Sequence, residues 1–401
     1  MPSFHTLDDM PNIEGKRVLV RVDFNVPIDA TTGMITDDTR IRGALPTLQF
    51  LLQRQARVIV MSHRGRPKTP NSQDSLRGVA AYLQTLLPNA VSFVDHIVGD
   101  EVDSAIQRMA PATILMLENL RFDPREKADD PGFSQMLAHL ADYYVDDAFG
   151  TAHRASASMV GVPQYLPSYA GRLMERELTV LSEILGHPDR PYWAIIGGAK
   201  VSDKVTLLGN LLDQVDGLII GGGMANTFLA AQGFFMGESK VEPEVLPTAQ
   251  HLLAQAQAKN IPVILPSDLV VATEFRADAP HRVVAVGQLG DQDMALDLGP
   301  GTISQIEAQL APARTVLWNG PMGVFEWDAF AGATMAVAHT LATLSAKVVV
   351  GGGDSVAAVH KAQVADKLTH VSTGGGATLE FLEGKTLPGV AALTHEGQEL
   401  R

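Results

Sequence analysis

The sequence predicts an α/β protein made of two domains, each containing a parallel sheet. Its 401 residues are more than one ordinary hydrophobic core holds, so two domains are expected. Short β-rich runs alternate with helical patterns along the whole chain, an order that is typical of α/β folds with right-handed crossovers. These runs are continuously apolar, as in strands that are buried on both faces of a parallel sheet.

The expected strands are followed repeatedly by charged residues or glycines. The strand-bearing runs cover 17–26, 56–62, 112–117 and 143–149 in the first half, and 192–200, 217–224, 261–272, 315–320 and 347–354 in the second. In α/β folds, ligands bind at the carboxyl ends of parallel strands. The repetition of such residues at several strand ends therefore indicates ligand binding in both halves.

A helix is expected between the two halves, over residues 171–186. Leu173, Leu181 and Leu185 place apolar groups on one stripe, and Gly186 and Pro188 end the pattern. The same pattern fits an ordinary core helix. Its place near the middle of the chain makes it a candidate interdomain helix.

The composition excludes several classes of protein. With 45 acidic against 31 basic residues, the formal net charge is −14, which argues against general nucleic-acid binding. The absence of cysteine excludes disulfides, cysteine-zinc sites and thiol catalysis. The N-terminal residues lack an apolar leader, and no stretch is long and apolar enough to span a membrane. We therefore expect a cytoplasmic protein that binds neither nucleic acid nor membrane.

The first half carries arginines at separate strand ends and loops. Together with one histidine, they are Arg21, Arg40, His63, Arg66, Arg121 and Arg154. The arginine guanidinium grips phosphate or carboxylate with a planar fork. Any one of them could instead form a surface ion pair, for example with Asp23 or Asp123. Because they occur in turns rich in Gly, Pro and Asn, the set as a whole indicates a site for a small polyanion.

The second half carries glycine runs at the starts of expected helices. Lys200 and Lys204 are four residues apart, which would place them on one face of a helix that begins after Gly198. Two lysines at a helix N-terminus suit an oligophosphate, although a solvated lysine face has the same spacing. Asp354 follows another glycine run and could hold a magnesium ion or simply cap a helix.

Two familiar nucleotide fingerprints are absent. The Walker pattern requires glycine five places before Gly384, where this chain has Leu379, and no G-x-G-x-x-G occurs. An NAD-linked dehydrogenase is therefore disfavoured, and the glycine runs form a phosphate site of another kind.

Taken together, the motifs resemble the phosphoglycerate kinase family. They are VRVDFNVP, SHRGRP, LENLRF, DAFGTAHRASASMVG, GGAKVSDK, GGGMANTF, WNGPMGVFE, VVVGGGDS and HVSTGGGATLEFLEGKTLPGV. They occur in the family's order and span nearly the whole chain. The resemblance implies two Rossmann-like domains joined by an interdomain helix and a hinge. It implies a 3-phosphoglycerate domain over 1–170, the helix 171–186, a nucleotide domain over 187–385, and a segment 386–401 that returns to the first domain.

The resemblance also implies the site residues. The 3-phosphoglycerate site falls on Asp23, Asn25, Arg40, His63, Arg66, Arg121 and Arg154. The nucleotide site falls on Gly198, Lys200, Lys204, Gly221, Asn319, Glu326, Gly352, Gly353, Asp354 and Ser355. By the same similarity, Glu326 binds the ribose hydroxyls and Asp354 coordinates Mg²⁺. Arg40 and Lys200 match the residues that stabilise the phosphoryl group during transfer.

The implied activity is reversible phosphoryl transfer between Mg-ATP and the carboxylate of 3-phosphoglycerate, giving 1,3-bisphosphoglycerate and ADP. We expect a monomer that closes about its hinge to bring the two domains together. The alternative is a two-lobed sugar-phosphate binding protein without catalysis. Three residues depart from the family pattern: Asp146 replaces an expected Asn, Arg64 replaces an apolar residue, and Ser355 replaces Thr.

Overall fold

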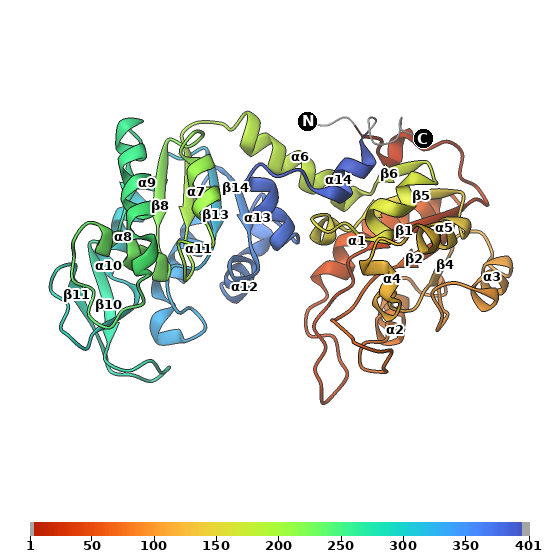
Figure 1. The fold of residues 1–401 in the computed structure, drawn as a ribbon, viewed down its shortest axis with the longest axis horizontal. Helices are drawn as coiled ribbons and strands as arrows, with labels where there is room; N and C mark the ends of the chain where they lie inside the picture. Colours follow the sequence, from red (N-terminus) through yellow and green to blue (C-terminus); the bar gives the residue numbers. More distant parts are fainter. Residues whose placement is uncertain (1–3, 395–401) are drawn as a thin grey trace. The chain divides into compact units, whose positions relative to one another are not determined.

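The computed structural model describes residues 4–394, which form two compact units (Figure 1). Unit 1 contains Met1–Thr179 and the C-terminal segment from Lys385, and unit 2 contains Val180–Gly384. The last part of the segment predicted to return to the first domain, 395–401, lies outside the described residues. Among residues 4–394, no helix has both the length and the apolar character needed to cross a membrane.

Unit 1 is built on one six-stranded sheet in which every pairing is parallel. The strand order is β3-β4-β2-β1-β5-β6. The strands are β1 (Arg17–Val22), β2 (Arg57–Met61), β3 (Val91–Phe93), β4 (Thr113–Met116), β5 (Tyr143–Asp147) and β6 (Ser168–Ala170). The four central strands are those expected from the continuous apolar runs. Their burial on both faces confirms the predicted parallel α/β architecture.

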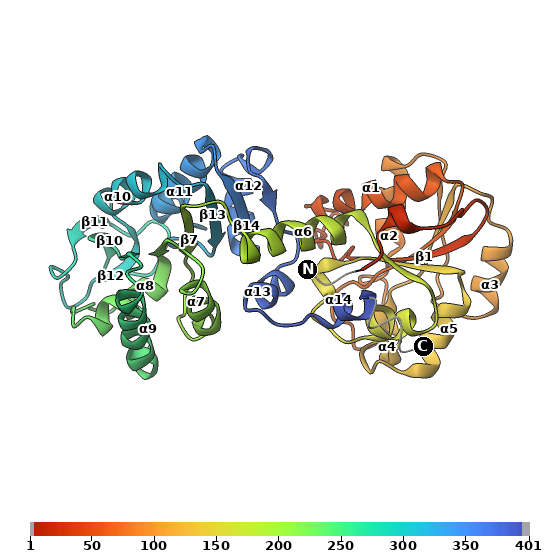
Figure 2. The same cartoon turned by 90° about the horizontal axis from the view of Figure 1, so that it is seen from above.

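Helices cover both faces of this sheet (Figure 2). They are α1 (Thr39–Gln53), α2 (Arg77–Leu86), α3 (Asp100–Gln107), α4 (Pro124–Lys127), α5 (Pro131–His139) and α14 (Pro388–Leu393). Alternate residues of β1, such as Val18 and Val20, share a buried cluster with Ile41 and Leu48 of α1. The opposite face of the sheet carries Leu19 and Arg21, which point the other way because side chains alternate along a strand.

Unit 2 also contains a six-stranded parallel sheet, with the order β15-β14-β13-β7-β8-β9. The strands are β7 (Tyr192–Ile196), β8 (Gly217–Ile220), β9 (Val263–Ile264), β13 (Thr315–Asn319), β14 (Lys347–Gly351) and β15 (His370–Val371). The helices are α7 (Val205–Leu211), α8 (Gly222–Ala231), α9 (Leu246–Ala258), α10 (Pro300–Leu310), α11 (Gly332–Thr343), α12 (Gly353–Lys361) and α13 (Gly376–Leu382). In Figure 2, α10, α11 and α12 lie on one face and α7, α8 and α9 on the other.

A small antiparallel sheet in unit 2 was not expected from the sequence. It has the order β11-β10-β12 and contains β10 (Asp268–Ala272), β11 (His281–Ala285) and β12 (Met294–Leu298). The β-rich run expected over 261–272 contains two strands, β9 and β10, which belong to different sheets. Pro266 lies between them and has no N–H to donate to a ladder, which explains the break.

The helix between the halves is α6 (Arg172–Gly186). Its N-terminus is capped from unit 1, where the Asp147 carboxylate accepts from the backbone N–H of Leu173 (2.9 Å) and Met174 (3.3 Å). The buried stripe runs along Met174, Leu178, Leu181 and Ile184. The prediction was right for Leu181, whereas Leu173 and Leu185 are only partly buried. The boundary between the two units falls within this helix, after Thr179.

Candidate functional site

The first candidate site lies at the carboxyl edge of the unit 1 sheet. Strands β1, β2, β4 and β5 are adjacent and parallel, so the residues that follow them reach the same edge. These residues, with one from the first turn of α1, are Asp23, Asn25, Arg40, His63, Arg66, Arg121 and Arg154. The structure therefore brings together at one edge all the residues that the resemblance assigned to 3-phosphoglycerate.

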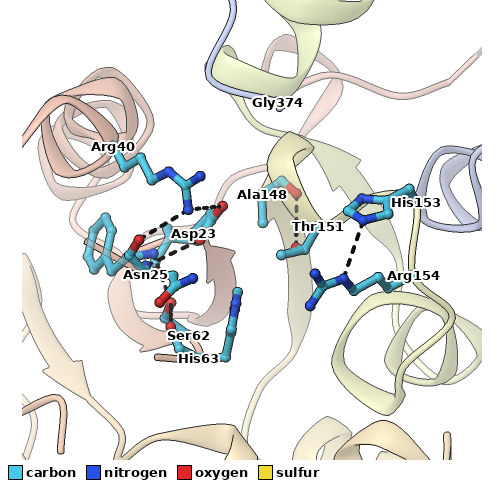
Figure 3. Close-up of polar contacts among 12 residues, drawn as sticks. Asp23, Asn25, Arg40, Ser62, His63, Ala148, Thr151, His153, Arg154 and Gly374 are labelled. Carbon is cyan, nitrogen blue, oxygen red and sulfur yellow. Dashed lines mark hydrogen bonds and ion pairs between the residues drawn. The ribbon is translucent and has the colours of Figure 1, made fainter. Parts of the chain in front are cut away.

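One part of this site is organised around Arg40 (Figure 3). Its Nη1 lies 3.0 Å from the Asp23 carboxylate and donates to the backbone carbonyl of Asn25 at 3.1 Å. The Asn25 side chain accepts from the N–H of Gly65 at 2.9 Å, which ties the loop after β1 to the loop after β2. Arg40 is thus held at the site by its neighbours while its side chain stays about one-third exposed.

The other part of the site concentrates positive charge. Burial and the nearby Arg154, Arg21 and Arg66 lower the pKa of Arg121 to about 10. Burial, followed by the same kind of repulsion, also holds the pKa of His63 well below its usual range. Burial is the larger cause of both pKa shifts, and the neighbouring guanidinium groups add to it, so a small anion bound here would relieve that repulsion.

Two departures from the family pattern lie near this site. The Arg64 guanidinium donates to the backbone carbonyl of Gln73. The backbone N–H of Arg64 donates to Asn119 Oδ1 at 3.1 Å. Asp146 is fully buried in β5, beside Arg21 of β1 in the register of the sheet. Burial raises the pKa of Asp146 to about 7, so much of this carboxyl is neutral near pH 7. Burial therefore reduces the negative charge that Asp146 carries beside the anion site.

The second candidate site lies at the carboxyl edge of the unit 2 sheet and begins with closely packed glycine turns. The N–H of Gly198 donates to Pro321 O at 2.9 Å, and the N–H of Gly222 donates to Met322 O at 3.0 Å. A Cβ on Gly320 would lie 2.2 Å from the carbonyl oxygen of Gly197. A side chain is thus excluded at Gly320, and the backbone there can come close to a ligand.

Lys204 and Asn319 join these turns to the next glycine run. Lys204 Nζ donates to Gly197 O at 2.8 Å and to Asn319 Oδ1 at 2.5 Å. The Asn319 amide donates to Gly351 O at 2.9 Å, and Ser355 Oγ accepts from the N–H of Gly320 at 2.5 Å. Burial lowers the pKa of Lys204 to about 8, which places a partly desolvated cation at this edge.

The predicted helix that would carry both lysines is wrong. Helix α7 begins at Val205, so Lys204 is its N-cap and Lys200 lies in the turn before it, exposed. The turn is held by a residue that is distant in the sequence. The Glu242 carboxylate accepts from the N–H of Val201 at 2.6 Å and from Ser202 Oγ at 2.5 Å. These bonds hold Val201 and Ser202 in a turn that precedes the helix.

Asp354 lies in the first turn of α12, whose N-cap is Gly352. Its carboxylate is exposed, and because Gly352 holds the N-cap position, Asp354 is not the N-cap of this helix. Among residues 4–394 there is no group of three or more potential metal-ligating His, Cys, Asp or Glu side chains. One exposed carboxylate fits Mg²⁺, which takes one or two protein carboxylates and completes its shell with phosphates and water.

Beside these groups unit 2 has a cavity of about 460 Å³. The site residues Gly198, Glu326 and Asp354 line it. Sequence reasoning missed its apolar wall, which comes largely from the antiparallel sheet and the neighbouring loops and includes Leu269, Phe275, Met294, Leu296, Leu298 and Met322. The alternating pattern of "MALDL" in β12 is the signal that could have indicated that strand. An apolar cavity beside a cationic glycine-rich edge suits a ligand with a flat ring and phosphates.

Comparison with known proteins identifies the family. Residues 7–385 match the family model of phosphoglycerate kinase. The chain is 57% identical over 392 residues to phosphoglycerate kinase of Moorella thermoacetica, covering 98% of this chain and 99% of that protein. The relative from Chloroflexus aggregans is 54% identical, with 94% of this chain and 96% of that protein covered.

Solved structures agree with this result. The structure of phosphoglycerate kinase from Coxiella burnetii matches with a TM-score of 0.88 and 41% identity, covering 98% of this chain and 99% of that one. The corresponding structure from Pyrococcus horikoshii matches with a TM-score of 0.83 and 32% identity over 97% and 98% of the two chains. The fold, the two strand-edge sites and these matches over nearly the full length lead to one conclusion: the chain belongs to the phosphoglycerate kinase family.

Proposed function

We propose that this chain transfers a phosphoryl group reversibly between Mg-ATP and the carboxylate of 3-phosphoglycerate, giving ADP and 1,3-bisphosphoglycerate. The observation that carries the proposal is that the two parallel sheets have different kinds of residues at their carboxyl edges. The arginine-rich edge belongs to unit 1, and the glycine-rich edge with Lys204 and its cavity belongs to unit 2. A phosphate-bearing acid and a nucleotide are the reactants that this pair of sites suits.

In this assignment unit 1 binds the acceptor. Arg66, Arg121 and Arg154 supply the charge for the phosphate, and Asp23, Asn25 and His63 offer hydrogen bonds to the rest of the molecule. Arg40 faces the carboxylate that receives the phosphoryl group. The reacting carboxylate is ionised at neutral pH, with a pKa of about 3.5 to 4, so the reaction needs no general base. The task of the protein is to place the reactants and to neutralise charge.

In unit 2 we assign the nucleotide to the cavity and the glycine turns. The base enters the apolar cavity, Glu326 receives the ribose hydroxyls, and the phosphates extend toward the backbone at Gly198, Gly221 and the N-terminus of α12. Gly352, Gly353, Asn319 and Ser355 shape that end of the site. Lys200 and Lys204 act on the phosphates, and Asp354 supplies a ligand to Mg²⁺. The metal, when bound, neutralises phosphate charge as the phosphoryl group moves.

The two sets of cations lie in separate units, so we infer that catalysis requires the units to close on their ligands by bending about the region of α6. Closure would also exclude water, which competes with the carboxylate as acceptor. The proposed division is a substrate domain over 1–170 with 386–401, the helix 171–186, and a nucleotide domain over 187–385. We further propose that the chain acts as a cytoplasmic monomer.

The direct test is a coupled assay with 3-phosphoglycerate, Mg-ATP, glyceraldehyde-3-phosphate dehydrogenase and NADH. Wild type should oxidise NADH, and Arg40→Ala should lower kcat by at least about 100-fold, the usual cost of removing one group that stabilises transition-state charge. Arg42→Ala is the matched control, because Arg42 lies on the same helix in an exposed pair with Asp38.

The outcomes separate the possible assignments. Equal activity of Arg40→Ala and wild type would remove Arg40 from the catalytic set while leaving the function intact. Folded wild type that binds 3-phosphoglycerate without oxidising NADH would overturn the proposal and favour the non-catalytic binding protein.

A further inference from the structure

A buried arginine lies directly behind the proposed acceptor site. Arg21, in β1, is only 2% exposed, and its Nη2 lies 3.1 Å from Nδ1 of His63, which is 3% exposed. In contrast, Arg66 and Arg154 of the same site are exposed. Arg21 therefore contacts a site residue from inside the protein and does not reach the surface where a ligand would bind.

The chemistry of this contact fixes the proton on the imidazole. An arginine side chain donates hydrogen bonds and cannot accept them. Nδ1 of His63 must then accept with its lone pair, so the ring carries its proton on Nε2. A doubly protonated ring would place Nδ1–H against the guanidinium N–H groups, which is unfavourable. Among residues 4–394, the hydrogen bond of the His63 ring is the one at Nδ1, so the N–H on Nε2 is left for a ligand.

Arg21 is itself held firmly by buried groups. Its Nε donates to Ser158 Oγ at 2.9 Å, and its Nη1 donates to the backbone carbonyl of Val22. Ser158 Oγ in turn donates to Glu126 Oε1 at 2.6 Å, and the N–H of Ser158 donates to Glu126 Oε2 at 3.0 Å. The Ser158 hydroxyl thus links the buried Glu126 carboxylate to Arg21. These hydrogen bonds fix the direction of the Arg21 guanidinium.

We propose that Arg21 is a positioning residue that locks His63 as the neutral Nε2–H tautomer and aims this N–H at an oxyanion or hydroxyl of the bound acceptor. This inference rests on the proposed function of unit 1. In Figure 3 the His63 ring lies between the Asp23–Asn25 group and Arg154, which is where an acceptor bound by both would pass. A neutral donor binds an anion's oxygen without adding another charge to a crowded cationic cluster.

The electrostatics of the site support this role. Burial holds the pKa of His63 well below its usual range, and Arg21, Arg121, Arg154 and Arg40 add to the effect in that order. The acidic groups near Arg21 are Glu126, which reaches it through Ser158, and Asp146, its neighbour across the sheet. Neither makes a hydrogen bond to the imidazole among the described residues, so nothing in the cluster favours the charged ring.

The tautomer can be measured without turnover. Two-bond ¹H–¹⁵N correlation spectra of histidine-labelled wild type, with His63 assigned by loss of its signals in His63→Asn, distinguish a protonated from an unprotonated ring nitrogen. We expect a neutral ring protonated at Nε2 throughout pH 5.5 to 8.5. A ring protonated at Nδ1, or an imidazolium at pH 7, would overturn the proposal whether or not any variant folds.

The Arg21→Met variant tests whether Arg21 determines the tautomer of His63. We expect mixed tautomers or titration of His63 in this variant, together with a rise of about 10-fold in KM for 3-phosphoglycerate and an unchanged KM for ATP. Arg57→Met is the control, since it also removes a strand arginine. Arg57 is partly buried and donates to Gly15 O, and its loss should leave the His63 signals unchanged.

The two levels of interpretation fail in different ways. Unaltered His63 spectra in folded Arg21→Met would contradict the positioning role even if the enzyme is active. An inactive wild type with the expected spectra would contradict the proposed function and leave the locked tautomer standing.

Discussion

At the scale of single residues, the arginines of unit 1 divide into those balanced within the protein and those left for a ligand. Arg17 pairs with Asp142 at 2.7 Å, and Arg21 is tied to Ser158 and Glu126. For Arg121, in contrast, burial lowers the pKa, and three neighbouring arginines lower it further. The sequence could not separate these groups, because it does not show which side chain each arginine contacts. Their partners come from distant parts of the chain.

Asp146 provides a test of how buried charge affects stability. Its pKa in the folded protein is about 7, above the ordinary value of 3.8. Protonated Asp146 adds to the free energy of unfolding in full when the pH is below 3.8, the pKa of the group in the unfolded chain. This contribution is lost as the pH rises through about 7, the pKa in the folded protein. Asp146→Asn should therefore gain stability relative to wild type between pH 5 and pH 8, by roughly 2 kcal/mol. Urea unfolding of both proteins at a series of pH values measures this difference.

Asp142→Asn is the matched control for this experiment. Asp142 lies just before the same strand, but its pKa is lowered and its partner is Arg17, so it stays charged from pH 5 to pH 8. Its effect on unfolding should be independent of pH in that range. A constant difference between Asp146→Asn and wild type over the same range would show that Asp146 does not titrate there.

At the scale of elements, the glycine turns of unit 2 explain why the strand ends can approach a ligand. Gly320 has φ of +98° and connects β13 to the rest of the site. A Cβ at this position would meet Gly197 O at 2.2 Å and Lys204 Nζ at 2.7 Å. The turn therefore depends on glycine both for its backbone conformation and for the space that Lys204 occupies.

Gly320→Ala should for this reason displace Lys204 and weaken nucleotide binding. We expect at least about a 10-fold higher Kd for Mg-ADP, equivalent to about 1.4 kcal/mol, measured by calorimetry, with 3-phosphoglycerate binding unchanged. Gly209→Ala is the control, since Gly209 lies within α7 and a Cβ there has no atom within 4 Å. It should leave binding intact and raise the unfolding free energy by roughly 0.5–1 kcal/mol. Equal nucleotide affinity in both variants would contradict this account of the turn.

At the scale of the whole molecule, the sequence predicted the two parallel sheets well because their central strands are long and continuously apolar. It missed β3, β6 and β15, which have two or three residues and carry no periodic pattern. It also missed the antiparallel sheet and with it the apolar wall of the cavity. The predicted helix through Lys200 failed because Glu242, far along the chain, holds the turn at Val201.

The candidate sites were predictable to the extent that strand ends and glycine turns mark them. The arginines of unit 1 and the glycine runs of unit 2 each come to one sheet edge because their strands are parallel neighbours. The network from Glu126 through Ser158 and Arg21 to His63 was beyond sequence reasoning. It joins residues that are 32, 137 and 42 positions apart and depends on burial.

Phosphoryl transfer requires that reactants held by separate units are brought together. Small-angle X-ray scattering can detect this closure when the protein is measured alone, with each ligand, and with 3-phosphoglycerate plus a non-hydrolysable Mg-ATP analogue. We predict that the radius of gyration decreases when both ligands are bound, and by more than with either ligand alone. Identical scattering profiles for the ligand-free and doubly liganded protein, under conditions where calorimetry shows both sites filled, would contradict the claim.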